Sequence, residues 1–294
     1  MGSTEAATAA PQACQECALA PGQADALVAL SQNAGWNQVA ADWRFMLQQG
    51  RGVGFADQAG RPVASAIHWP VGGRLDWISM VLTHTDWRKR GFGTRLLQRC
   101  IDAATASQRA AGLDATELGR PLYATMGFRE LYTLARWRLE RVGVPTDVPA
   151  GIAIRAATAA DIDALAGFDR LYSGMNRATL LAHLVGRAPR VAMVATAGGK
   201  VRGYVLGRDG RTASQIGPIV AESDAVALAL LSRAVAAADL PVMLDVPDRH
   251  AAIGAWIAAA GGTAPRRFWR MVLGDAPGLD DPRCLYAIAG PELG

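Results

Sequence analysis

The order of predicted helices and strands repeats once along the chain, and this repeat restricts the fold more than any other feature. In residues 13–141 and again in 152–274, apolar periodicity and turn residues predict one series: a strand, helices, three strands, a helix, a strand, a helix and a final strand. Two copies of one α+β unit account for this order. The length of 294 residues also suits two domains, at roughly 100–200 residues each.

Three segments fall outside the two units. Residues 1–12 are rich in Ala and Thr, and we expect them to be disordered. Residues 142–151 contain Gly and Pro and few side chains that could pack, which is typical of a linker. Residues 275–294 are expected to form a C-terminal tail.

The composition is that of a soluble globular protein, with 51% hydrophobic and 19% charged residues. The net charge of +4 comes almost entirely from arginines scattered between acids, without the run of like charges that is typical of nucleic-acid tails. No apolar stretch reaches the roughly 18–20 residues of a membrane helix, and nothing resembles a secretory signal. We therefore expect a cytoplasmic protein that binds neither nucleic acid nor membrane.

The four cysteines indicate neither a metal site nor a disulfide scaffold. Cys14 and Cys17 have the spacing of a redox or zinc pair, but no second pair and no histidines at ligand spacing accompany them. Two cysteines on one early strand are the simpler interpretation. Cys100 and Cys284 lie far from any other cysteine, which fits a reducing compartment. We expect no metal.

Residues 81–94 carry the strongest chemical signal. A predicted strand ends there, a basic turn with two glycines follows, and a helix begins. A helix N-terminus presents unpaired backbone N–H groups and the positive end of a dipole, which favour a phosphate. Gly91 and Gly93 allow a ligand to approach the backbone. Positive charge is added by Arg88, Lys89 and Arg90.

The glycine spacing excludes two common phosphate-binding motifs. A dinucleotide fingerprint needs a third glycine where Leu96 stands, and no Gly-Lys-Ser/Thr of a P-loop is present. The pattern Arg88-x-x-Gly91-x-Gly93 resembles the acetyl-CoA pyrophosphate loop of the GNAT acyltransferase superfamily, Gln/Arg-x-x-Gly-x-Gly/Ala. Further on, Tyr123 in a short helical segment, followed by Gly127-Phe128, is similar to a later motif of that family.

The resemblance implies a mixed, mostly antiparallel central sheet flanked by helices in each unit, with acetyl-CoA as co-substrate. It places the pantetheine arm along the backbone of Val81, Leu82 and Thr83. It makes Tyr123 the general acid toward the CoA sulfur, although a tyrosine that is merely packed would fit the same position. The pyrophosphate would be bound by Arg88, Lys89, Arg90, Gly91, Phe92, Gly93 and Thr94.

The second unit resembles the C-terminal GNAT-like domain of bacterial tandem acetyltransferases. It departs from the pattern after its third central strand, where Glu222 and Asp224 stand in place of a basic glycine loop. Acidic groups at that position would repel a pyrophosphate. The second domain is therefore expected to be degenerate, and only the first is expected to bind acetyl-CoA.

The acceptor site is expected on the helices after the first strand, which flank the acceptor in this superfamily. Aromatic and acidic side chains there would suit an ammonium group. An alternative is that Trp43 belongs to the core and Asn37 caps a helix. Asp42, His68 and Asp76 remain open as candidates for the base. The acceptor candidates are Gly35, Trp36, Asn37, Gln38, Asp42, Trp43 and Asp76.

These observations predict a GNAT-type N-acetyltransferase that moves an acetyl group to the amine of a small molecule. Two alternatives remain open, namely acetylation of protein or peptide N-termini and a non-catalytic acetyl-CoA sensor. The resemblance also allows a homodimer.

Overall fold

The computed structural model describes residues 13–276, 278–281 and 283–294. The disorder predicted for residues 1–12 lies outside this part of the chain. Within the described residues, no helix is both long enough and apolar enough to cross a membrane. The first half contains β1 (Cys14–Leu19), α1 (Ala24–Asn33), α2 (Ala40–Gln49), β2 (Arg51–Asp57), β3 (Pro62–Pro70), β4 (Leu75–Thr83), α3 (Phe92–Ala106), β5 (Ala110–Thr116), α4 (Arg120–Thr125) and β6 (Arg129–Leu139).

The second half repeats this order, so the predicted mixed α+β fold with two related units is confirmed. Residues 142–151, the predicted linker, contain no helix or strand. The second half contains β7 (Ala153–Ala156), α5 (Ile162–Ser173), α6 (Ala178–Arg187), β8 (Met193–Ala197), β9 (Lys200–Arg208), β10 (Ser214–Ala221), α7 (Asp224–Ala237), β11 (Val242–Pro247), α8 (Ala251–Ala259), β12 (Thr263–Leu273) and β13 (Leu285–Ala287).

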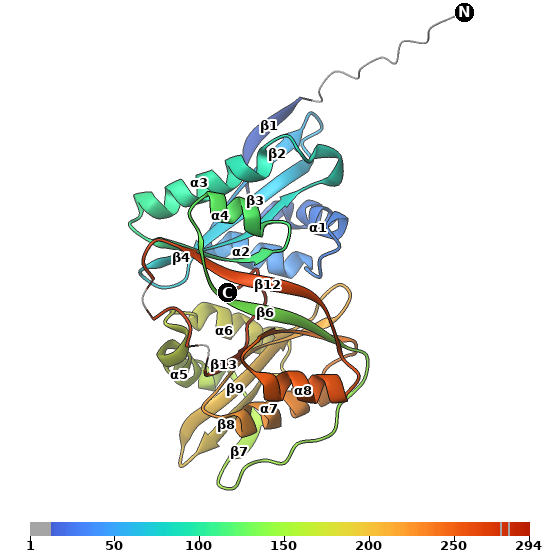
Figure 1. Ribbon diagram of the computed structural model, residues 1–294, viewed down its shortest axis with the longest axis vertical. Helices are drawn as coiled ribbons and strands as arrows, with labels where there is room; N and C mark the ends of the chain where they lie inside the picture. The colour runs from blue at the N-terminus through green and yellow to red at the C-terminus, as the bar shows by residue number, and fades with distance from the viewer. Residues whose placement is uncertain (1–12, 277, 282) are drawn as a thin grey trace, which may run out of the picture.

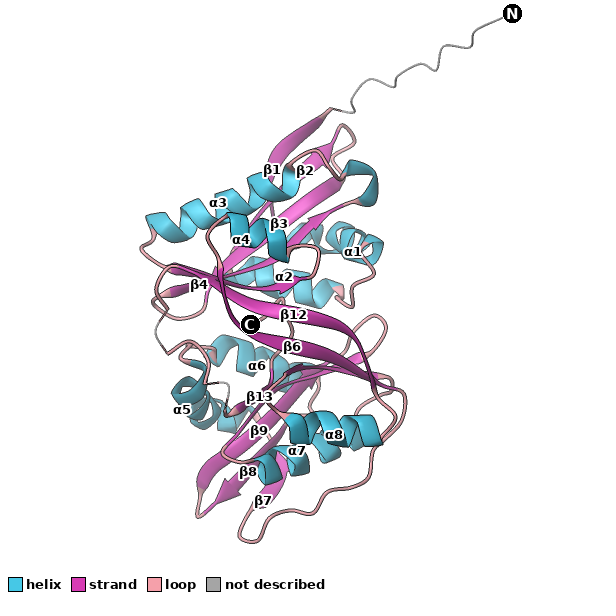
Figure 2. Ribbon diagram, viewed as in Figure 1, coloured by secondary structure: helices cyan, strands magenta, loops and turns pink. Residues whose placement is uncertain are grey.

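The two halves exchange their long final strands and share one continuous sheet. The strand order is β1-β2-β3-β4-β5-β12-β6-β11-β10-β9-β8-β7, so β12 of the second half lies between β5 and β6 of the first. Strand β6 in turn pairs with β11. Figures 1 and 2 show β6 and β12 crossing the middle of the molecule together. The predicted units 13–141 and 152–274 are therefore not separate in space. The sequence could not show this, because alternation predicts a strand without specifying its neighbour.

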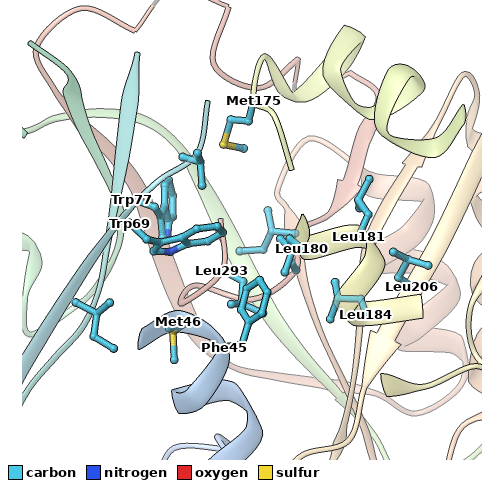
Figure 3. Close-up of a cluster of buried hydrophobic side chains, with 14 of the residues drawn as sticks. Phe45, Met46, Trp69, Trp77, Met175, Leu180, Leu181, Leu184, Leu206 and Leu293 are labelled. Atoms are coloured by element: carbon cyan, nitrogen blue, oxygen red, sulfur yellow. The ribbon is translucent and has the colours of Figure 1, made fainter. Parts of the chain in front are cut away.

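The largest core cluster joins the halves. Trp69 and Trp77 of the first half face the leucines of α6, and Leu293 packs between them (Figure 3). Residues 285–289 are also fully or almost fully buried. Residues 275–294 are thus not a free tail: their apolar run Leu285–Ala289 is long enough to insert into the sheet.

A buried ion cluster holds β12 in its exchanged position. Arg270 on β12 donates two hydrogen bonds to Asp114 on β5, of 2.9 and 2.8 Å, and pairs with Asp280. Its guanidinium lies over the ring of Trp77, 4.7 Å from the centroid. Arg270 and both carboxylates are buried. The second half therefore supplies the counter-charge that the first half needs to bury Asp114.

Candidate active site

Strands β4 and β5 separate in the middle of the sheet. They pair in parallel only at Leu75–Ala110, Asp76–Ala111 and Trp77–Gly112. Beyond this point Met80 has a φ of +52°, and the β3–β4 register shifts, which marks a bulge in β4. The backbone edge of β4 from Ile78 onward thus has no strand partner on the β5 side. A bulge beside a splayed pair is a place where a ligand can pair with the backbone.

A pocket occupies this gap. Both halves of the chain contribute to it, because Arg266 and Phe268 of β12 and residues 291–292 line it together with residues of the first half. It is lined by Trp36, Gln38, Ile78, Ser79, Met80, Val81, Leu113, Asp114, Thr116, Tyr123, Arg136, Arg266, Phe268, Pro291 and Glu292.

Tyr123 lies on the pocket wall in the short helix α4. Its side chain is buried, and burial raises the pKa of Tyr123 to about 12, with the nearby Cys100 thiol adding to the effect. The ring packs near Phe128, with 6.2 Å between centroids. Among the described residues no partner accepts a hydrogen bond from the hydroxyl. The phenol is therefore a protonated, unengaged donor at neutral pH.

The turn before α3 presents free backbone donors. Gly91, with a φ of +76°, is the N-cap of α3 and offers no side chain to the first turn. Lys89 is also left-handed, at +61°. In the described part of the chain, no acceptor meets the amides of Phe92, Gly93 and Thr94. A Cβ built on Gly93 would approach only Thr83 Oγ1, at 4.0 Å, so an anion has room there.

The corresponding place in the second half is closed. At the N-terminus of α7, Ser223 accepts a hydrogen bond from the Val226 amide, and Asp224 accepts one from the Tyr286 hydroxyl. Strand β13 pairs with β10, and the Ile288 amide donates to the Asp245 carbonyl of β11 at 3.0 Å. The chain's own strand therefore fills the gap between β10 and β11 that would correspond to the pocket.

Two predicted acceptor residues have structural partners instead. Asn37 binds the α1–α2 connection to the loop before β10. Its Oδ1 accepts a hydrogen bond from the Thr212 amide at 2.8 Å, and its Nδ2 donates one to the Ala213 carbonyl at 2.9 Å. Asp42 accepts from the Val39 amide and pairs with Arg187 and Arg208. Neither residue lines the pocket.

The remaining predicted residues divide between core and pocket. Trp43 is completely buried among apolar side chains, as the alternative interpretation held. Asp76 lies on β4 before the gap. Burial alone would raise the pKa of Asp76, but hydrogen bonds from His68 and Arg109 lower it, which makes it a poor base. Trp36 does line the pocket.

Gln38, which was expected at the acceptor site together with Trp36, lines the pocket. Other polar residues of the pocket were not predicted as site residues, because they come from segments that were assigned to strands or to a tail. No local motif marks three of them, because only the strand exchange and the buried C-terminal segment bring them to the gap. These three are Arg136, Arg266 and Glu292.

The splayed strands, the bulge and the uncapped helix define an acyltransferase fold, and comparisons with known proteins agree. Residues 48–130 and 165–287 each match a family described as acetyltransferase (GNAT) domain. The chain is 26% identical over 228 residues to the Bacillus subtilis protein named uncharacterized N-acetyltransferase YitH, covering 77% of this chain and 80% of that protein.

Solved structures share the whole arrangement. A putative acetyltransferase from Pyrococcus horikoshii aligns with a TM-score of 0.79 at 18% identity, covering 99% of each chain. A tandem GNAT protein from the clavulanic acid biosynthesis pathway aligns with a TM-score of 0.61 at 17% identity, covering 90% of this chain and all of that one. The protein is an acyltransferase. It belongs to the GNAT acetyltransferase superfamily and carries two such domains in tandem.

Proposed function

We propose that the protein transfers an acetyl group from acetyl-CoA to the amine of a small molecule, using the first domain alone. The observation that carries this proposal is the open gap between β4 and β5, which has Tyr123 on its wall and the uncapped end of α3 beside it. The pyrophosphate would bind at residues 88–94. The pantetheine arm would follow the free backbone edge of Val81, Leu82 and Thr83.

The chemistry follows from the groups at the gap. The neutral amine attacks the thioester carbonyl, a C–N bond forms, and the C–S bond breaks. A backbone N–H of the bulged β4 strand would hold the carbonyl oxygen as it gains charge. Tyr123 would donate to the leaving sulfur, and the proton lost by the amine balances the proton gained by the thiol.

The closed wall of the pocket favours a small acceptor. Phe268 of β12, with Pro291 and Glu292, lines the same pocket as Tyr123, so residues of the second half would limit the space for an acceptor. A protein N-terminus would need an open groove there. A non-catalytic acetyl-CoA sensor would bind acetyl-CoA without transferring the acetyl group. A measurement of turnover therefore distinguishes a sensor from an enzyme.

Gly93→Glu tests the co-substrate site. The new carboxylate would lie at the free amides of α3 and repel the pyrophosphate, and we expect acetyl-CoA binding to weaken about tenfold or more. Calorimetry with acetyl-CoA and release of free thiol with a panel of amines measure the effect. Gly186→Glu is the matched control, because Gly186 is also helical, has no described atom within 4 Å of a built Cβ, and lies on the exposed face of α6. Equal binding by wild type and the Gly93 variant would contradict the proposal.

The pH dependence tests the state of Tyr123. Because its pKa is raised to about 12, the donor form persists far above neutral pH. We expect kcat/KM to rise with pH as the acceptor amine loses its proton, and no fall between about pH 7 and about pH 10. A thiol-release pH profile checks this. An alkaline fall that disappears in Tyr123→Phe would show that the hydroxyl ionises within this range.

A further inference from the structure

The part of the pocket proposed to bind the substrate amine contains a buried carbonyl oxygen that accepts no hydrogen bond from the described residues. Gln38 is 3% exposed and lines the pocket beside Trp36. Its Oε1 atom is buried and accepts no hydrogen bond from the described residues. A buried carbonyl oxygen without a partner is costly, so this atom is suited to an N–H of a bound molecule.

Negative charge reaches the same pocket as Gln38. Glu292, also 3% exposed, lines the pocket and pairs with Arg208. Arg208 also pairs with Asp42, which pairs with Arg187, which pairs with Asp209. These ion pairs join three carboxylates and two guanidiniums. Arg136, whose charge also acts on Glu292, is already paired with Asp245, so one negative charge stays in excess. Gln38 and Glu292 together would hold an ammonium or amine.

A surplus of positive charge lines the same pocket from the exchanged strands. Arg266 on β12 stands directly opposite Arg136 on β6, so both side chains share one face of the sheet. Arg136 donates to Asp245 at 2.7 and 2.8 Å. Arg266 is exposed and forms no ion pair at contact distance within the described residues; Asp245 attracts it only from further away, so two guanidiniums share one carboxylate. Like charges opposite one another are unfavourable unless an anion joins them.

We infer that the acceptor is a small zwitterion, whose amine is held by Gln38 and Glu292 and whose anionic group is held by Arg266. This inference rests on the proposed acetyl transfer and names the substrate class of that site. A carboxylate and a phosphate would both suit a guanidinium, so the shared feature is an anion close to a primary amine.

Matched acceptor pairs test the anion. The probes are the common amino acids, each with its neutral α-amide, together with phosphoethanolamine as a phosphate-bearing amine. Release of thiol from acetyl-CoA is the measurement. We expect at least one anion-bearing amine to exceed its neutral partner, or ethanolamine in the case of phosphoethanolamine, about tenfold or more in kcat/KM. If the largest difference in kcat/KM is found for an amino acid and its amide, the anion is a carboxylate. If it is found for phosphoethanolamine and ethanolamine, the anion is a phosphate.

The variant Arg266→Gln tests whether Arg266 causes the preference for anion-bearing amines. It should reduce kcat/KM for the preferred acceptor about tenfold, leave the neutral partner unchanged, and leave the KM of acetyl-CoA unchanged. Arg267→Gln is the matched control: the neighbouring residue points to the opposite face and pairs with Asp248. Its kinetics should equal those of wild type.

Gln38→Leu separates binding from structure. The change removes an unsatisfied buried oxygen, so thermal stability should hold or rise, while KM for both members of a pair should increase several-fold. A fall in stability together with an unchanged KM would assign Gln38 to the fold and overturn its role in the acceptor site.

Three results would overturn the acceptor class. They are equal or better turnover of neutral amines, an equal loss for both partners in Arg266→Gln, and no transfer to any anion-bearing amine. The first two leave acetyl transfer itself intact. In the third case, calorimetry with acetyl-CoA distinguishes two outcomes. If the wild type binds acetyl-CoA and Gly93→Glu does not, the proposed co-substrate site stands. If the wild type does not bind acetyl-CoA, the proposed function is overturned as well.

Discussion

Tyr123→Phe is expected to lower kcat about 100-fold or more and to leave the Kd of acetyl-CoA within about twofold of wild type. The hydroxyl has no partner among the described residues and lies on the pocket wall, so its removal costs the fold little. It would remove the donor to the leaving sulfur, and only the transition state carries charge on that atom. Single-turnover thiol release and calorimetry measure the two quantities.

Tyr172→Phe serves as the control for this change. Tyr172 lies on α5, outside the pocket, and is only partly buried. Its variant should turn over like wild type. If Tyr123→Phe kept the wild-type kcat, Tyr123 would be a packing residue and a different group would protonate the thiolate.

Arg270→Ala is expected to reduce the free energy of unfolding by about 3–5 kcal/mol, because it leaves buried carboxylates without their cation. Burial raises the pKa of Asp114, and Arg270 opposes that rise. Without Arg270 the pKa of Asp114 would rise further, above its value in the unfolded chain. Stability from such a group is present at low pH and lost as pH rises through the folded pKa. The deficit should therefore shrink on acidification.

Denaturant unfolding at neutral and mildly acidic pH measures both effects. Arg270→Lys keeps a positive charge but loses the bidentate hydrogen bonds to Asp114. Its free energy of unfolding should therefore fall less than that of Arg270→Ala. Arg267→Ala, on the exposed face of the same strand, should change stability by about 0.5 kcal/mol or less. A deficit in Arg270→Ala that grew on acidification would contradict the ion-cluster account.

Local signals in the sequence predicted the elements and the glycine turn before α3, where we propose that the co-substrate binds. Gly91 needs a left-handed backbone, and the helix after it leaves its first amides free, which are properties of a few adjacent residues. The short helix with Tyr123 is equally local. Each could be predicted because the residues that form it are neighbours along the chain.

Apart from Trp36 and Gln38, the proposed acceptor side could not be predicted, because it depends on pairing between distant segments. Arg266 reaches the pocket only because β12 lies between β5 and β6. Glu292 reaches it only because β13 anchors the segment before it. Even within the α1–α2 connection, Trp36 and Gln38 face the pocket while Asn37, between them, binds the loop before β10. Residue type alone does not distinguish these directions.

The exchanged strands also order the events of biosynthesis. A chain that leaves the ribosome contains the pyrophosphate turn and Tyr123 long before residues 263–273 and Glu292 appear. Until then the edge of β5 has no neighbour, Asp114 has no cation, and the acceptor wall does not exist. A nascent chain can therefore acquire the features proposed to hold the co-substrate, but not the complete pocket proposed for the acceptor. If the proposed site is correct, catalytic competence arises only after residues 263–292 have been made, and a product terminated before them would lack it.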